Sequence, residues 1–164
     1  MRILITGGTG FIGQALQTYL HALGHQTRVL SRKNGWDIQR GYLAEDALEN
    51  IDAIVHLAGA GIADGRWTES RKKELIHSRV ASTKLLAEAL KTRQHKVHTF
   101  VSASAIGYYG ADSGEAICTE SSPAGNDFLS ACTQAWEQAV DAIQGPRVVK
   151  LRIGLVLGAK GGIF

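Results

Sequence analysis

Cysteine is scarce in this chain of 164 residues, which contains only Cys118 and Cys132. The two are not spaced like metal ligands, and two cysteines cannot supply the dense disulfide framework of a small secreted domain. No secretory apolar segment precedes the first expected strand. These absences favour a reducing compartment, the cytoplasm or an organelle interior, and we expect a cytoplasmic protein without a bound metal.

The sequence also lacks long apolar runs and a strong excess of charge of one sign. No run approaches the roughly 20 residues that are needed to span a bilayer. The formal net charge is +3, and basic residues form short clusters such as Arg71-Lys72-Lys73, so nucleic-acid binding is not indicated. Apolar residues make up 45% of the chain, which is ordinary for a soluble protein. We expect one domain over residues 1–164 and neither a membrane nor a nucleic acid as its partner.

Glycine is plentiful, and its spacing in Thr6-Gly-Gly-Thr-Gly-Phe-Ile-Gly13 is informative. An apolar, strand-like run precedes this stretch, and apolar residues at helical spacing follow it. The pattern predicts a dinucleotide-binding turn, in which Gly7 permits a tight turn, Gly10 lets backbone N–H groups approach a pyrophosphate, and Gly13 lets the helix press on its strand. The alternative is a glycine-rich turn without a ligand. The predicted cofactor-binding residues here are Gly7, Thr9, Gly10, Phe11, Ile12 and Gly13.

The residues after the second expected strand, 26–31, bear on the choice of cofactor. NAD-binding domains place an acidic residue about 20 residues after the glycines, where it binds the ribose 2′-OH. This chain has Ser31, Arg32 and Lys33 instead. A guanidinium and a hydroxyl suit a 2′-phosphate, which a carboxylate would repel. Ser31 and Arg32 therefore predict NADP rather than NAD, the alternative being that the basic residues form a solvated turn.

Strand-like and helix-like segments alternate along the rest of the chain. The sequence predicts strands over 36–38, 52–57, 98–103 and 147–157, and helices over 43–48, 66–91 and 127–143. Thr68 is expected to cap the long helix, and residues 111–126 form a loop long enough to be functional. Small residues at 58–61 let a nucleotide approach the backbone, unless they only form a tight turn. This alternation predicts an α/β protein with a doubly wound parallel sheet, the Rossmann fold.

Several longer motifs occur in a characteristic order. They are the glycine turn already described, Ser31-Arg32, His56-Leu-Ala-Gly59, Arg66-Trp67-Thr68, Ser78-Arg79, Ser104-Ala-Ile-Gly-Tyr108 and Leu151-Arg-Ile-Gly-Leu-Val-Leu-Gly158. With them the chain resembles the extended short-chain dehydrogenase/reductase superfamily of NAD(P)-dependent epimerases and dehydratases, and within it the atypical branch called epimerase family proteins. The resemblance implies a homodimer formed through the two long helices. It also implies that the cofactor lies near Leu57, Ala58, Gly59, Glu74 and Arg79, the alternative for the last two being an exposed charged helix face.

The superfamily's chemistry uses a Tyr-x-x-x-Lys pair and a serine that polarises the substrate carbonyl. Ser104 matches that serine. The pair is missing, because the start of the expected helix, Phe128-Leu-Ser-Ala-Cys132-Thr133, contains neither tyrosine nor lysine. Tyr108 and Tyr109 are the nearby phenols, and they either take part in catalysis or form aromatic walls of the nicotinamide pocket.

Two functions follow from these features. The first is an NADP-dependent oxidoreductase or epimerase with an unknown small-molecule substrate, in which Ser104, Tyr108 and Tyr109 are the catalytic candidates. The second is a non-catalytic, NADP-binding regulatory or scaffold protein, related for example to cell division. Superfamily members continue into a smaller C-terminal domain that holds most substrate contacts. We expect this substrate domain to be absent here, the chain being either a fragment or a naturally short form.

Overall fold

A five-stranded parallel sheet forms the centre of the computed structural model, which describes residues 1–31, 33–158 and 161–162. Its strand order is β2-β1-β5-β6-β7, and every neighbouring pair is parallel. The strands are β1 (Arg2–Thr6), β2 (Gln26–Leu30), β5 (Ala53–His56), β6 (Thr99–Ala105) and β7 (Arg147–Ile153). The predicted α/β fold with a parallel sheet is confirmed.

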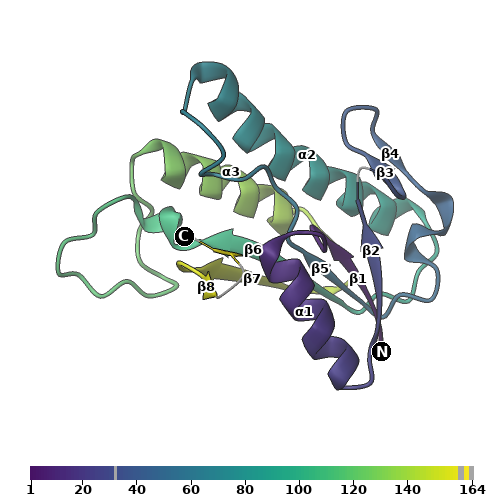
Figure 1. The fold of residues 1–164 in the computed structure, drawn as a ribbon. Helices are drawn as coiled ribbons and strands as arrows, with labels where there is room; N and C mark the ends of the chain where they lie inside the picture. Colours follow the sequence, from purple (N-terminus) through teal and green to yellow (C-terminus); the bar gives the residue numbers. More distant parts are fainter. Residues whose placement is uncertain (32, 159–160, 163–164) are drawn as a thin grey trace.

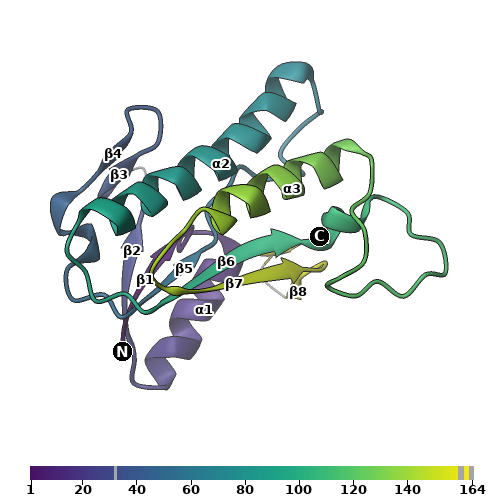
Figure 2. The same ribbon diagram turned by 180° about the vertical axis from the view of Figure 1, so that it is seen from behind.

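Helices cover both faces of this sheet. As Figures 1 and 2 show, α2 (Glu69–Thr92) and α3 (Phe128–Asp141) lie on one face, and α1 (Phe11–Ala22) lies on the other. Alternate residues of each strand pack on opposite faces of the sheet, because successive side chains of a strand point in opposite directions.

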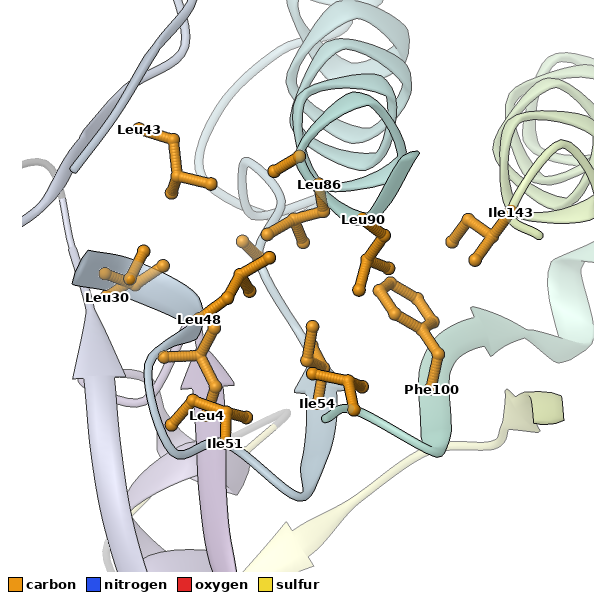
Figure 3. Close-up of a cluster of buried hydrophobic side chains, with 14 of the residues drawn as sticks. Leu4, Leu30, Leu43, Leu48, Ile51, Ile54, Leu86, Leu90, Phe100 and Ile143 are labelled. Atoms are coloured by element: carbon orange, nitrogen blue, oxygen red, sulfur yellow. The ribbon is translucent and has the colours of Figure 1, made fainter. Parts of the chain in front are cut away.

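The larger core lies beneath α2 and α3. Leu4, Ile54 and Phe100 point into it from three strands, and Leu86 and Leu90 enter it from α2 (Figure 3). The smaller core joins the sheet to α1. It consists of Ile3, Ile5 and Ala53, with Leu16 and Leu20 of α1 packed against them.

Short local signals set the ends of the helices. Thr68 caps α2, as expected, by accepting a hydrogen bond from the backbone N–H of Arg71. The long helix consequently begins at Glu69 rather than at residue 66. Asp127 caps α3 in the same way, with the N–H of Ser130 as donor.

The segment after β2 differs from the prediction. The residues expected as a third strand form β3 (Trp36–Asp37), which pairs antiparallel with β4 (Tyr42–Leu43) and lies outside the main sheet. Only residues 31–35 separate β2 from β3, whereas a parallel neighbour needs a crossover of about a dozen residues. The helix predicted over 43–48 is the short 3-10 helix η1 (Glu45–Leu48), because its first residues belong to the hairpin.

The last strand of the sheet is shorter than predicted. It was expected to reach residue 157, but β7 ends at Ile153, opposite Ala105, where its partner strand also ends. Beyond that point no strand of the described residues continues the pairing with β7. The chain instead forms a small antiparallel pair, β8 (Leu157–Gly158) with β9 (Gly161–Gly162).

Candidate functional site

The glycine turn lies between β1 and α1 and brings three chain segments into close contact. Gly7 has a φ of +71°, which favours glycine, and a Cβ there would lie 2.8 Å from the carbonyl carbon of Leu57. A Cβ on Gly13 would lie 2.4 Å from the carbonyl oxygen of Gly7. Gly10 is the N-cap residue of α1, and the nearest atom to a Cβ there would be 3.3 Å away. Gly7 and Gly13 therefore have no space for a side chain. Gly10, which lies between them, leaves the start of α1 free of a side chain.

A cleft of about 750 Å³ opens beside this turn. It lies at the carboxyl ends of β1, β2 and β5, which is where open α/β sheets bind ligands. Six predicted cofactor-binding residues line it, namely Gly7, Thr9, Ser31, Ala58, Gly59 and Glu74. Six others lie outside its lining, namely Gly10, Phe11, Ile12, Gly13, Leu57 and Arg79. Arg32 falls outside the residues that the structure describes.

Part of the cleft wall was not anticipated from the sequence. The β3–β4 hairpin contributes Trp36, Asp37, Ile38 and Gln39, and the beginning of α2 contributes Arg71, His77 and Ser78. The hairpin residues reach the cleft because β3 folds back outside the main sheet. A single sequence does not reveal that placement.

Polar contacts fix the segment that follows β5, residues 57–61, over the cleft. The N–H of Ala58 donates to Thr6 Oγ1 at 3.3 Å, and the N–H of Ala60 donates to Ser78 Oγ at 3.0 Å. Arg71 Nη2 donates to the carbonyl of Gly61 at 2.6 Å. The backbone of the segment is therefore held from β1 on one side and from α2 on the other.

His56 lies beneath this segment and is fully buried. Its Nδ1 is 2.7 Å from Thr6 Oγ1, and its Nε2 is 3.1 Å from Thr83 Oγ1 and 3.3 Å from Ser82 Oγ. Aromatic rings of Trp36, Phe100 and Trp136 surround the imidazole, with ring centres 6.0–6.4 Å away. Burial lowers the pKa of His56 to about 3, so the imidazole is neutral at physiological pH.

Arg79 lies next to the same segment, on α2. Its Cζ would be 3.1 Å from a Cβ on Gly59 and lies 5.2 Å from the centre of the Trp136 ring. Within the described residues it has no carboxylate partner, and its one hydrogen bond runs from Nη1 to the carbonyl of Leu75 at 3.0 Å. Burial lowers the pKa of Arg79. A guanidinium with spare donors beside the cleft can bind the oxygens of a ligand.

Ser104 lies at the end of β6 and is buried against α3. Its hydroxyl donates to Glu137 Oε1 at 2.5 Å, and Arg152 of β7 donates to both oxygens of that carboxylate, at 2.8 and 3.0 Å. Burial opposes ionisation of Glu137, but the hydrogen bonds from Arg152 and Ser104 outweigh it and lower its pKa. The same ion pair raises the pKa of Arg152.

Tyr108 and Tyr109 lie in the short helix η2 (Ile106–Tyr109) and are engaged differently by Arg152. The Tyr109 hydroxyl accepts a hydrogen bond from Arg152 Nη1 and donates one to the carbonyl of Thr119, both at 2.9 Å. The Tyr108 ring lies under the guanidinium, with 3.4 Å between Cζ and the ring centre. Among the described residues, the Tyr108 hydroxyl makes no hydrogen bond.

The beginning of α3, which corresponds to the position of the superfamily's Tyr-x-x-x-Lys pair, has no ionisable side chain except Cys132. The ring of Phe128 packs against Trp67, with 5.5 Å between ring centres, and the Thr133 hydroxyl donates to the carbonyl of Leu129. Cys132 is buried, which raises the pKa of its thiol despite the nearby Arg79. Among the described residues no group of three or more potential ligands is placed to hold a metal ion, and no helix is long and apolar enough to cross a membrane.

The parallel sheet, the glycine turn and the cleft at the strand ends together define a Rossmann-type dinucleotide-binding domain. A model of the NAD dependent epimerase/dehydratase family matches residues 3–161, and the chain belongs to that family.

Similar proteins support the narrower resemblance to the epimerase family branch. Epimerase family protein YfhF of Bacillus subtilis is 36% identical over 99% of this chain and 57% of its own length. Human epimerase family protein SDR39U1 is 40% identical, again over 99% of this chain and 57% of its own. This chain thus spans a little over half the length of these relatives.

Two solved structures have the same fold. The crystal structure of human SDR39U1 (isoform 2) with NADPH has a TM-score of 0.85 and 38% identity, and the match covers 99% of this chain and 57% of that one. A nucleoside-diphosphate sugar epimerase from Corynebacterium glutamicum has a TM-score of 0.85 and 37% identity, covering 99% of this chain and 36% of that one.

Proposed function

We propose that this chain binds NADP(H) across the carboxyl ends of its strands. The observation that carries the proposal is the cleft of about 750 Å³, which joins the glycine turn to the small residues after β5. The turn leaves the first N–H groups of α1 accessible to a pyrophosphate. The human relative that was crystallised with NADPH supports the same choice of nucleotide.

The adenosine half of the nucleotide fits the cleft between β2 and α2. Ser31 lines the cleft, and its Oγ accepts the N–H of Lys33 at 3.3 Å, so a turn at the end of β2 faces the ligand. Arg32 directly follows Ser31 in the sequence, and a guanidinium there would bind the 2′-phosphate. Calorimetric titration with NADPH and NADH tests this part of the proposal. Tighter binding of NADH would contradict it.

We further propose an oxidoreductase or epimerase activity on a small molecule. Bound NADP would supply the site that accepts or returns hydride. The candidate residues of this chain for proton exchange near the end of β6 are Ser104, Tyr108 and Tyr109. A screen of carbonyl substrates with NADPH, read at the absorbance of the nicotinamide, tests the activity.

A non-catalytic NADP-binding role is the second candidate, because two of the three candidate side chains near β6, those of Ser104 and Tyr109, already have hydrogen-bond partners. The Ser104 hydroxyl donates to Glu137, and the Tyr109 hydroxyl has partners for both its hydrogen and its oxygen. Nucleotide binding without turnover across a broad substrate panel would favour this regulatory or scaffold role. Hydride turnover with any substrate would favour the enzyme.

A further inference from the structure

A continuous series of buried hydrogen bonds passes beneath the cleft through His56. It starts at the backbone N–H of Ala58, continues through the hydroxyl of Thr6 to the imidazole, and reaches Ser82 and Thr83 on α2. The side chains of Thr6, His56, Ser82 and Thr83 are all fully buried. Every hydrogen in the series must therefore find its acceptor within the protein.

The bonds on the α2 side determine which ring nitrogen of His56 carries the hydrogen. The hydroxyls of Ser82 and Thr83 donate to the carbonyl oxygen of Arg79, at 3.0 and 2.8 Å. A hydroxyl has only one hydrogen to give. Both hydroxyl oxygens can consequently only accept from the imidazole, which places a hydrogen on Nε2.

The bonds on the β1 side lead independently to the same tautomer. Thr6 Oγ1 accepts the N–H of Ala58, and within the part of the chain that the structure describes the one acceptor near its own hydrogen is His56 Nδ1, at 2.7 Å. A hydrogen on Nδ1 would leave the hydroxyl hydrogen of Thr6 without an acceptor among the described residues. Leaving a buried donor unpaired is costly, so Nδ1 accepts. The series then runs in one direction, from the Ala58 N–H to the Arg79 carbonyl.

One end of this series lies at the proposed nucleotide site, and the other lies on the turn of α2 that carries Arg79. Ala58 lines the cleft, and the side chain of Arg79 packs against Gly59, the next residue of the same segment. His56 thus joins the backbone after β5 to the turn of α2 that carries Arg79. A side chain that could not both accept at Nδ1 and donate at Nε2 would break this connection between the two elements.

We propose that His56 is held as the Nε2–H tautomer and is a positioning residue for the dinucleotide, fixing the Ala58 backbone and the Arg79 turn relative to each other. The tautomer follows from the hydrogen bonds alone, whereas the positioning role rests on the proposed function. The proposal therefore has two separate tests.

The first test is nitrogen NMR of the full chain with labelled histidine. We expect one His56 signal set with a hydrogen on Nε2 and none on Nδ1, unchanged between pH 8 and pH 5 because burial lowers the pKa of His56 to about 3. Thr6→Val removes the donor to Nδ1 and should shift that nitrogen most. A hydrogen on Nδ1 in the wild-type protein would overturn the proposal, whatever the protein binds.

The second test is calorimetric titration with NADPH of Thr6→Val and of the matched variant Thr6→Ser, which keeps the hydroxyl. We expect Thr6→Val to weaken binding about tenfold, equivalent to about 1.4 kcal/mol, and Thr6→Ser to remain within about twofold of wild type. If Thr6→Val binds NADPH as well as wild type while only its melting temperature falls, His56 has a structural role and the positioning claim is wrong. Wild type that binds no NADPH would instead refute the proposed function, and the tautomer would still be decided by NMR.

A variant on the α2 side covers the case in which Thr6→Val does not fold. Thr83→Val leaves Ser82, at 3.3 Å, as the one acceptor for the Nε2 hydrogen. We expect it to weaken NADPH binding about threefold, less than the loss of the unshared Thr6 contact. Unchanged affinity in folded Thr83→Val would overturn the positioning role in the same way.

Discussion

The hydroxyl of Ser104 donates its hydrogen to the carboxylate of Glu137, with 2.5 Å between the two oxygens. Arg152 binds both oxygens of the same carboxylate. The serine that matches the superfamily's carbonyl-polarising residue thus has its hydrogen engaged within the protein. To donate to a substrate, Ser104 would first have to break its hydrogen bond to Glu137. The Glu137–Arg152 ion pair, which holds that carboxylate in place, therefore bears on the proposed chemistry as well as on stability.

The Glu137–Arg152 pair should contribute strongly to stability. Glu137→Ala would leave the mostly buried guanidinium of Arg152 without its carboxylate partner, and we expect the free energy of unfolding to fall by about 3–5 kcal/mol. Glu69→Ala is the matched control, since the Glu69–Lys72 pair is exposed, and it should cost no more than about 0.5 kcal/mol. Urea unfolding followed by circular dichroism measures both. Equal losses of unfolding free energy in the two variants would contradict a strong stabilising contribution of the Glu137–Arg152 pair.

The close packing of the glycine turn predicts that a side chain at Gly13 lowers stability and prevents NADPH binding. A Cβ on Gly13 would lie 2.4 Å from the carbonyl oxygen of Gly7, and backbone on both sides leaves little room to adjust. We expect Gly13→Ala to cost about 2–3 kcal/mol and to abolish NADPH binding. The control is Gly24→Ala, because Gly24 has a φ of +76° but no atom within 4 Å of a Cβ. That variant should lose only about 1 kcal/mol and keep its affinity.

The parts of this molecule that the sequence predicts are those determined by neighbours along the chain. The apolar run of β1, the contact of Gly13 with Gly7 and Gly8, and the capping hydroxyl of Thr68 all depend on residues that are close in sequence. The short strand at Trp36 and Asp37 was predicted, but its pairing with β4 outside the main sheet was not, because the length of the linker after β2 and not a side-chain pattern keeps it out of the sheet.

The polar core was not predicted, because its partners are distant in sequence. Glu137 and Arg152 are 15 residues apart and meet only because α3 packs over β7. The available signal was the presence of charged residues among the apolar residues of α3 and β7, an acid at Glu137 and bases at Lys150 and Arg152. Charged side chains that are buried in a protein usually form ion pairs. The same reasoning applies to His56, whose partners on β1 and α2 are 50 and 27 residues away.

Acid should destabilise the fold through His56 before it affects the carboxylates. The folded-state pKa of about 3 lies below the usual 6.5, so the unfolded chain binds more protons in this range and stability rises with pH. The contribution is complete above pH 6.5 and is lost as the pH falls towards 3. We expect a loss of about 2–3 kcal/mol between pH 6.5 and pH 4.5, measured by urea unfolding at each pH. In His56→Gln this loss should disappear, and a loss of the same size there would assign it to other groups.

The nucleotide preference should depend on the residue after Ser31. Arg32→Glu places a carboxylate where a 2′-phosphate is proposed to bind, and we expect the ratio of NADPH to NADH affinity to fall by at least about tenfold, or about 1.4 kcal/mol. Lys91→Glu makes the same charge change at the far end of α2 and should leave the ratio unchanged. Titrating both variants with both nucleotides separates a local effect from the change in net charge. An unchanged ratio in Arg32→Glu would remove the argument for NADP from this position.

If the protein is an enzyme, replacing Tyr108 and replacing Tyr109 should have different effects on turnover and stability. The Tyr108 hydroxyl makes no hydrogen bond among the described residues, whereas the Tyr109 hydroxyl links Arg152 to Thr119. We therefore expect Tyr108→Phe to reduce kcat by about 100-fold or more with unchanged stability, and Tyr109→Phe to cost about 1 kcal/mol of unfolding free energy with a smaller effect on kcat. Steady-state kinetics with a substrate found by NADPH oxidation, together with thermal unfolding, measure both effects. Turnover that survives both substitutions would exclude the phenols from the chemistry and, with Ser104 bound to Glu137, would require a proton donor from elsewhere in the protein.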